Sequence, residues 1–435
     1  MKALFRFVPV CLAFAAIRTH AQSTDAVAQA CSLEQAYDRA LATDQNIAIA
    51  IAEIKKANLV TWAAASTVGP KVTGNASFTQ PQHDINGSQG PINVDTRFAN
   101  IVLQQPLFDP QIFAALRSGK LSVEASKLAF KSTVRTVLFG VTQAYYDVLK
   151  NQHVVEVNRQ TLQLAHEQLG LAERRYNVGV AVKTDMLRAR VQVEQANRAV
   201  TESENSLELA HIVLVNVLNM SCYFTVTEPA VAEPTKDTLE DLQKRAFERR
   251  EDFLAGKIAI RQSEENVNLV KADYGPRATG QFSYQWIDPE TQSQKSDFWV
   301  ALVGVQWPIF NGGKRSVDLR NAAYQKTEAE LRQESLEKAV DQDVRAAWLN
   351  VHSLEKTLVA LKAQVDAAAE NYKDLQSQYQ AGAATSLDVM TALNDLNSAR
   401  RDLTTQTYDY QVALLNLDRA TGIFQDQRVE KLKTP

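Results

Sequence analysis

The side chains best placed to do chemistry in this chain gather at two similar turns, each expected between two helices. Both turns carry a tyrosine, a glycine three residues later, and an aspartate six residues after that. With one threonine and one further aspartate they form the candidate tip residues: Tyr176, Gly179, Thr184, Asp185, Tyr379, Gly382, Asp388 and Asp395. Carboxylates that converge in a narrow opening raise the local negative potential and favour cations. These residues therefore predict a gate or docking tip, not covalent chemistry.

A purely structural role explains part of this pattern. Each glycine can supply the left-handed residue that follows a helix end. Thr385 and Asp388 have the spacing of a capping box, in which two side chains cap the start of a helix reciprocally. Asp185 has Val182 at the equivalent position, so capping explains this aspartate less well. Both interpretations of the aspartates remain open at this point.

No other group of residues indicates an enzyme. The histidines after His20 show no spacing typical of metal ligands; they are His83, His153, His166, His211 and His352. Gly312-Gly313 lacks the rest of a phosphate-binding fingerprint, and no nucleophile is paired with a base. The formal charge of −3 gives no basic surface for nucleic acid. We therefore predict no catalytic residue, no metal, no cofactor and no nucleic-acid partner.

The elements that position the two turns are duplicated along the chain. Gly69-Pro70 recurs as Gly275-Pro276, and Pro106-Leu107-Phe108 recurs as Pro308-Ile309-Phe310. The offsets, like that between the two tip turns, stay near 200 residues, which indicates one duplicated unit. The repeats span about 32–222 and 238–424. Each is expected to contain a helix, two strands, a long helix, a turn and a helix.

The predicted helices differ greatly in length. Helices over about 109–177 and 313–380, with no proline after Pro110 in the first turn, would each be roughly 100 Å long at 1.5 Å per residue. The shorter helices are expected at 32–67, 184–220, 238–274 and 386–421. Two short helices together match one long helix, so we expect them to stack end to end beside it, with 223–237 and the tail from 423 forming a collar. One stripe typical of helix packing comprises Val134, Leu138, Val141, Tyr145, Val148 and Leu149.

The strands are expected as two β-hairpins, at about 71–107 and 277–310. Their residues alternate between apolar and polar, which is typical of a strand with one exposed face. Trp299 and Trp307 share a face and lie roughly 26 Å apart at 3.3 Å per residue. This separation matches the ~25 Å apolar band and aromatic girdles of an outer-membrane barrel. The expected lipid-facing residues are Phe282, Trp286, Trp299, Val303, Val305 and Trp307.

The first 21 residues have the pattern of a secretory signal peptide, with Lys2 and Arg6 before a short apolar run. Cleavage is expected after Ala21. The remaining chain then contains two cysteines, Cys31 and Cys222. Both are expected near the collar, where an oxidising compartment would allow a disulfide. Two unpaired buried cysteines are an equally good alternative.

Taken together, these motifs resemble the TolC family of bacterial outer-membrane efflux proteins. The resemblance rests on Leu33–Ala36, on the Pro-Leu-Phe and Pro-Ile-Phe motifs, and on the two Tyr-x-x-Gly turns with their aspartates. It covers nearly all of the chain after the signal. It implies a mainly α fold with membrane β: a homotrimer with a 12-stranded β-barrel, four strands per protomer, and an α-barrel crossing the periplasm. It also implies docking of the tip onto a periplasmic adaptor protein, which links it to an inner-membrane transporter.

The resemblance implies roles for the tip residues as well. In the family, contacts among Tyr, Asp and Thr close the tip, often with an Arg from the second turn. Tyr379, Asp388, Thr184 and Asp185 match this pattern. The position of the Arg is Ala384 here, and a second acidic position is Thr391. This chain therefore departs from the family pattern at the arginine.

We therefore predict a trimeric channel-tunnel of the bacterial outer membrane that extends into the periplasm and exports substrates, with lipid around its barrel. The alternative is a soluble periplasmic helical scaffold whose hairpins mediate trimerisation. Extraction separates the two, because a membrane barrel requires detergent and a scaffold does not.

Overall fold

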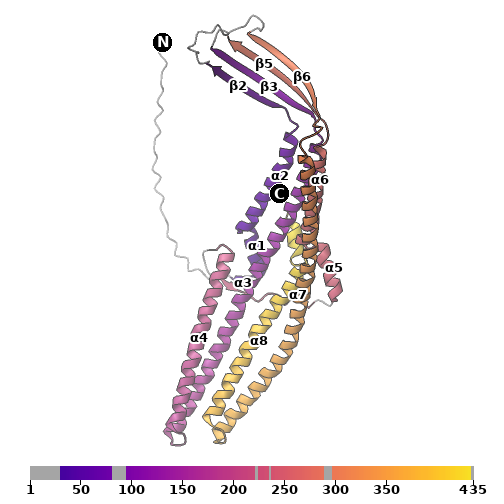
Figure 1. Cartoon of the computed structure of the whole chain (residues 1–435). Helices are drawn as coiled ribbons and strands as arrows, with labels where there is room; N and C mark the ends of the chain where they lie inside the picture. The colour runs from indigo at the N-terminus through magenta and orange to yellow at the C-terminus, as the bar shows by residue number, and fades with distance from the viewer. Residues whose placement is uncertain (1–29, 81–94, 221–223, 235–236, 289–295, 433–435) are drawn as a thin grey trace, which may run out of the picture.

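The computed structural model shows a long rod of helices that carries one curved β-sheet at one end (Figure 1). The structure describes residues 30–80, 95–220, 224–234, 237–288 and 296–432. The predicted signal peptide lies outside these residues. No helix in the described ranges is both long and apolar enough to cross a membrane.

Two helices run almost the whole length of the rod. They are α3 (Gln111–Asn177, 67 residues) and α7 (Lys314–Ala381, 68 residues). Each turns back at the tip into a shorter partner, α4 (Lys183–Val217) or α8 (Ser386–Ala420). These lengths confirm the predicted long and short helices. The predicted apolar stripe from Val134 to Leu149 on α3 is fully buried, so packing of this face against neighbouring helices is confirmed.

The remaining helices are broken, and here the prediction of two continuous helices was wrong. The expected helix over 32–67 is α1 (Leu33–Thr43) followed by α2 (Gln45–Ser66), and the expected helix over 238–274 is α5 (Leu239–Arg249) followed by α6 (Glu251–Ala272). In both repeats an 11-residue helix precedes a 22-residue helix, and a single residue separates them.

Local chemistry explains each break. Asp44 is extended, with φ −70° and ψ 130°, and its carboxylate accepts hydrogen bonds from the N–H groups of Asn46 and Ile47. This is an N-cap, and aspartate is among the residues that favour it. Arg250 is extended as well, and Glu251 and Asp252 fill the first turn of the next helix, where the helix dipole favours acidic side chains. The Arg250 guanidinium binds Asp252 and Asp343, which fixes the break against α7.

The predicted end-to-end stacking of short helices is confirmed. α1, α2 and α4 all pack against α3, and the Thr43 hydroxyl at the end of α1 donates a hydrogen bond of 3.3 Å to the carbonyl of Leu218 beyond α4. The capping box predicted at the start of α1 is also present, between Ser32 and Gln35.

The sheet contains four antiparallel strands in the order β2-β3-β5-β6. They are β2 (Lys71–Thr79), β3 (Thr96–Phe108), β5 (Arg277–Asp288) and β6 (Asp297–Gln306). The central pair joins the two repeats, with Ile101 opposite Tyr284. Among the described residues, the outer strands β2 and β6 each have one edge without a partner strand, and they run in opposite directions.

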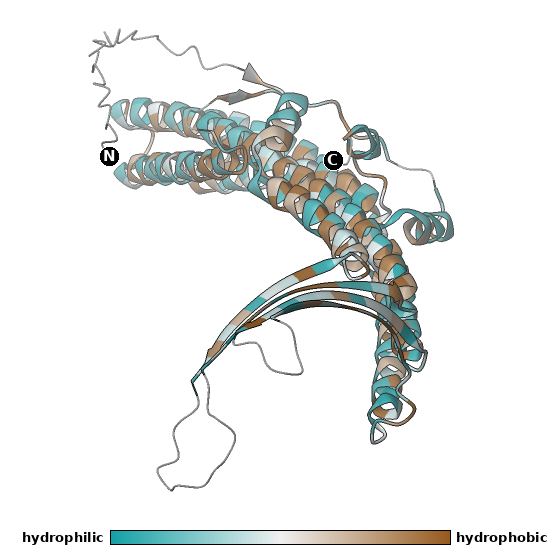
Figure 2. Ribbon diagram, turned by 90° about the horizontal axis from the view of Figure 1, so that it is seen from above, coloured by the Kyte–Doolittle hydropathy of each residue, from teal (hydrophilic) through white to brown (hydrophobic). Residues whose placement is uncertain are grey.

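The two faces of the sheet differ in polarity. One face carries Val72, Ile101, Phe282 and Trp299, and the rings of Phe282 and Trp299 stack with centroids 6.1 Å apart. The other face is mostly polar on β2 and β5, although Val300 and Leu302 of β6 lie on it. Seen from above, the sheet bends into an arc (Figure 2). The predicted strand phase therefore agrees with the register.

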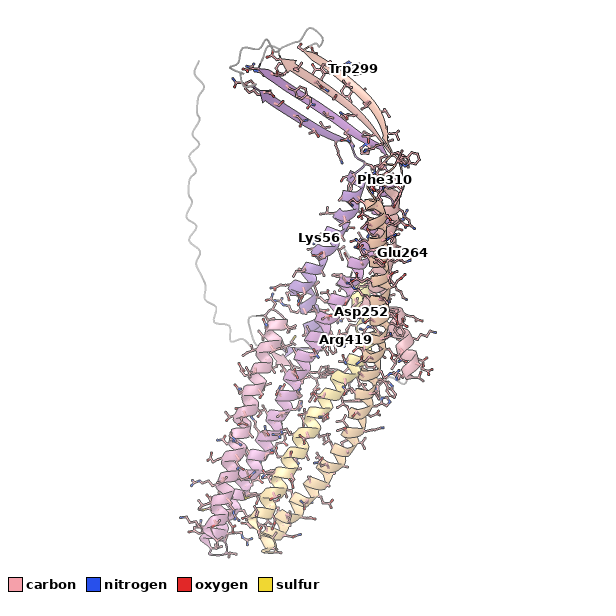
Figure 3. The ribbon with its side chains drawn as sticks, viewed as in Figure 1. Lys56, Asp252, Glu264, Trp299, Phe310 and Arg419 are labelled. Carbon is pink, nitrogen blue, oxygen red and sulfur yellow. The ribbon has the colours of Figure 1, made fainter. Side chains whose placement is uncertain are left out.

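The predicted lipid-facing residues lie together on the apolar face. Phe282, Trp286, Trp299, Val303 and Val305 are all exposed there. Trp307 lies one residue beyond β6, and its indole N–H donates a hydrogen bond of 3.0 Å to the carbonyl of Tyr274. Figure 3 shows Trp299 at the far end of the sheet and Phe310 where the strands meet the helices. Contact of these residues with lipid stays a prediction.

A collar of short elements surrounds the middle of the rod. β1 (Ala30–Cys31) pairs in parallel with β4 (Thr225–Val226), and the Tyr145 hydroxyl binds the backbone of both Cys31 and Thr227. Cys31 is a free thiol in the structure, and burial raises its pKa. Cys222 lies outside the described residues, so the disulfide stays a prediction.

A buried arginine holds the two repeats together at this level. Arg135 of α3, only 6% exposed, pairs with Glu251 of α6 at 2.7 Å and with Asp426 of α9 (Asp426–Lys431) at 2.8 Å. Its guanidinium also donates to the carbonyl of Phe424. Gly422 lets the C-terminal segment lie against the break between α5 and α6, because its φ is +77° and a Cβ there would lie 3.1 Å from the Arg250 backbone nitrogen. The C-terminal segment is therefore tied to both repeats.

Candidate functional site at the helical tip

The two predicted tip turns lie side by side at the end of the rod farthest from the sheet (Figure 1). Gly179 ends α3 with φ +77°, and Gly382 ends α7 with φ +82°. In each turn the glycine N–H donates to the carbonyl of the tyrosine three residues earlier, at 3.0 Å for Tyr176 and 3.1 Å for Tyr379. The left-handed role predicted for both glycines is confirmed.

The two aspartates behave differently. Asp388 is exposed and forms the predicted capping box: its carboxylate accepts from the N–H of Thr385 at 2.9 Å and from the Thr385 hydroxyl at 2.6 Å. These bonds lower the pKa of Asp388. Val182 is the N-cap residue of α4 and its side chain cannot form a capping box with Asp185. Asp185 instead accepts a hydrogen bond of 2.6 Å from the hydroxyl of Ser386. Asp185 therefore connects the two hairpins, whereas Asp388 stabilises its own helix.

Arg175 and Tyr379 make the second connection at the tip. The Arg175 guanidinium carbon lies 4.6 Å from the centroid of the Tyr379 ring, a cation–π contact. One guanidinium nitrogen also donates to the carbonyls of Tyr379 and, at 3.3 Å, of Gln380. The tyrosine is 5% exposed, and burial raises the pKa of Tyr379. Through Arg175, the last turn of α3 therefore binds the last turn of α7.

Polar side chains continue this connection along the two hairpins. Gln168 donates to the hydroxyl of Tyr372 at 3.1 Å, and Gln192 donates to Asn394 at 2.6 Å. The Thr161 hydroxyl donates to Asn397 at 2.8 Å. Small apolar residues pack between these bonds. We call the set of cross-hairpin contacts the polar seam; it comprises Thr161–Asn397, Gln168–Tyr372, Gln192–Asn394, Asp185–Ser386 and Arg175–Tyr379.

Sequence reasoning selected only part of the residues that meet here. Of the predicted set, Tyr379 and Asp185 make contacts at the junction. The others are exposed: Tyr176, Gly179, Thr184, Gly382, Asp388 and Asp395. Arg175, Ser386 and the seam amides were not among the predicted residues. A signal exists for the amides, because Gln168 and Tyr372 are 204 residues apart and Gln192 and Asn394 are 202 apart. Polar residues that recur at the repeat offset on an apolar face mark a contact between repeats.

The arrangement can act mechanically. Among the described residues, no group of three or more His, Cys, Asp or Glu side chains can hold a metal ion. Every seam contact joins a residue of the first hairpin to one of the second, so separating the hairpins breaks all of them together. Such a set of directional bonds holds the two hairpins in one relative position.

Comparison with known proteins identifies the family. A family model described as "Outer membrane efflux protein" matches residues 36–220 and 242–423. The chain is 22% identical to outer membrane protein TolC of Vibrio cholerae, covering 92% of each chain. It is 23% identical to the alkaline protease secretion protein AprF of Pseudomonas aeruginosa, covering 77% of this chain and 72% of AprF.

Solved structures share the fold. A membrane protein from Pseudomonas aeruginosa aligns with a TM-score of 0.79 at 21% identity, covering 90% of both chains. The outer membrane protein VceC of Vibrio cholerae aligns with a TM-score of 0.76 at 18% identity, covering 90% of this chain and 96% of VceC. The family match extends over most of the sequence, including both hairpins of the tip. The chain therefore belongs to the outer membrane efflux protein family, the TolC family.

Proposed function

We propose that the chain assembles into a homotrimeric channel-tunnel that exports substrates across the periplasm and the outer membrane. Members of this family are outer-membrane channels that reach into the periplasm, and this location applies to the chain as a family member. The trimer and its transport role are our inference from the geometry of one chain.

The observation that carries the proposal is the open sheet. In the part of the chain that the structure describes, β2 and β6 each leave one edge unpaired and run in opposite directions, so β6 of one copy can pair antiparallel with β2 of the next. Exposed edges of this kind are normally covered or closed into a barrel. A barrel with an aqueous interior needs more than about eight strands. Three copies of this four-stranded sheet satisfy that need, with the apolar face towards lipid.

The helical rod has two free sides that match the sheet edges. α2 packs beside α3, α4 packs mainly beside α3 and also touches α8 near the tip, and α7 packs beside α5, α6 and α8. Exposed apolar side chains lie on both free sides, including Leu59 and Trp62 on α2 and Tyr324 and Leu331 on α7. A surface that contacts a different surface on its neighbour closes into a ring when the rotation fits. The same three-fold arrangement would then continue from the barrel into the helices.

The partners follow from the family and from the position of the tip. Relatives are named as outer membrane efflux and protease secretion proteins. We propose that a periplasmic adaptor protein docks on the two tip turns and links this chain to an inner-membrane transporter. The exposed valines of the first turn, Val178, Val180 and Val182, supply an apolar surface for that contact.

Mass measurement and conductance together test the proposal. The purified protein should require detergent for extraction, form a trimer in mild detergent, and produce discrete conductance steps in planar bilayers. A stable monomer or dimer would contradict the trimer. A trimer that extracts without detergent and never conducts would instead support the periplasmic scaffold.

A further inference from the structure

We propose that Arg175 is the residue that keeps the two hairpins of each protomer together at the tip. It acts as a positioning residue on the ring and backbone of Tyr379, with no part played by the tyrosine hydroxyl. This inference rests on the proposed channel function, because it assigns the contact that a gate would have to release.

The contact is built from three separate interactions. The guanidinium lies over the Tyr379 ring with its carbon 4.6 Å from the centroid, and it donates to the carbonyls of Tyr379 and Gln380. The Tyr379 carbonyl also accepts from the Gly382 N–H at 3.1 Å, and a carbonyl oxygen can accept a second hydrogen bond. The helix dipole makes this end of α7 negative. Arg175 therefore places a cation from one hairpin on the negative end of a helix in the other.

The tyrosine hydroxyl contributes no bond to this contact. Its oxygen is buried and has no hydrogen-bond partner among the described residues. Burial raises the pKa of Tyr379, and the positive Arg175 opposes that rise only in part, so the hydroxyl stays neutral. The ring face, by contrast, is covered by the guanidinium. The aromatic surface is thus the part of the tyrosine that the arginine holds.

The sequence of the second turn supports an arginine acting from the first. The position where the family pattern carries an Arg is Ala384, a side chain that cannot donate a hydrogen bond. Arg175 lies on the opposite hairpin and reaches the same junction. The arginine that joins the two hairpins is therefore supplied by α3 and binds α7.

The test compares conductance of reconstituted trimers carrying Arg175→Ala, Arg175→Lys and Arg174→Ala. Arg174 is exposed on the same helical turn, so its removal deletes the same charge without touching Tyr379. Loss of the Arg175 contacts should raise the open fraction about tenfold. Lysine keeps the charge but lacks the planar guanidinium, so the open fraction of Arg175→Lys should lie between those of the wild type and Arg175→Ala. Equal behaviour of Arg175→Ala and Arg174→Ala would overturn the proposal.

Variants of Tyr379 separate the ring from the hydroxyl. Tyr379→Ala should raise the open fraction as Arg175→Ala does, and the double variant should add little, because both remove one contact. Tyr379→Phe keeps the ring and should lie far closer to the wild type than Tyr379→Ala. Opening by Tyr379→Phe as large as by Tyr379→Ala would overturn the assignment to the ring. A wild-type trimer without any conductance would overturn the proposed function itself. If the wild type conducts normally and the Arg175 variants conduct as the wild type does, only the role proposed for Arg175 is overturned.

Discussion

Asp185 and Ser386 are joined by a hydrogen bond of 2.6 Å, although 201 residues of chain separate them. Each stands at the beginning of the helix that returns from the tip, Asp185 in α4 and Ser386 in α8. A hydrogen bond to an ionised carboxylate is stronger than one between neutral groups. The bond therefore fixes the relative height of the two returning helices at the tip.

The two partners of this bond should respond unequally to removal. Asp185→Ala leaves the buried Ser386 hydroxyl unpaired, which should lower stability by about 1–2 kcal/mol. Ser386→Ala leaves the half-buried Asp185 to water and should cost less than about 1 kcal/mol. Thermal unfolding in detergent measures both. Ser206→Ala, an exposed serine of α4 with only a local bond to Glu202, is the matched control; a greater loss from Ser386→Ala than from Asp185→Ala would contradict the assignment.

Asp388 should shape ion selectivity as well as cap its helix. Three copies of an exposed carboxylate around one axis favour cations, so Asp388→Asn should shift the reversal potential of the trimer towards lower cation preference. The hydrogen bonds from Thr385 lower the pKa of Asp388, so the charge and its capping contribution are present at neutral pH and disappear only as pH falls through that lowered value. Cation preference should therefore persist below pH of about 4, the ordinary range of a carboxylate. An unchanged reversal potential in Asp388→Asn would leave the residue as a cap only.

Val303 should face lipid near the middle of the barrel wall. Its side chain is 72% exposed in one chain, on the face shared with Trp299. Val303→Arg should cost roughly 2–4 kcal/mol per site if that face meets the bilayer midplane. Gln281→Arg, on the opposite face of the neighbouring strand, should be tolerated. Heat stability of the trimer on gels reports both variants, and equal tolerance would show that the strand phase is wrong.

Asp418 should make stability rise as the solution is acidified from neutral pH. Burial raises the pKa of Asp418 to about 6, and Arg245 opposes this only in part. The folded state then binds a proton more readily than the unfolded chain, so stability increases as pH falls from above 6 towards the unfolded value of about 4. Asp418→Asn should remove this dependence and add up to about 2 kcal/mol at pH 7. Denaturant unfolding at pH 5 and pH 7 measures it, and identical pH profiles for the variant and the wild type would contradict it.

The long helices, the hairpins and the capping boxes could be predicted because their causes are local. Gly-Pro pairs end the upper helices, apolar residues recur at helical spacing along α3, and Thr385 and Asp388 cap α8 by their spacing alone. The strand faces followed from simple alternation, and the register of β5 with β6 agrees with it.

The breaks at Asp44 and Arg250 escaped prediction because the apolar period continues through them. Ala40, Ile47 and Ile54 are buried at intervals of seven residues. Ala40 lies in α1 and the two isoleucines lie in α2, so the first interval spans the break at Asp44. A continuous helix and two helices in line therefore share one pattern. At the first break, only the capping side chain of Asp44 distinguishes two helices from one continuous helix. Aspartate also occurs within helices, so its presence in the sequence does not by itself predict a break.

Arg175 escaped prediction for a different reason. An arginine in the last turn of a helix is expected on electrostatic grounds, and nothing nearby in sequence indicates a partner. Its contact with Tyr379 exists only because two hairpins 204 residues apart lie next to each other. The relative placement of the repeats is set by the whole polar seam and the collar.

The matching breaks in the two repeats have a mechanical consequence. Beside each interrupted pair of helices, α3 and α7 pass the same level without interruption. The breaks leave α3 and α7 as the only helices among the described residues that connect the level of the sheet to the tip without interruption. A displacement at the tip should therefore be transmitted to the sheet mainly along these two helices of each protomer.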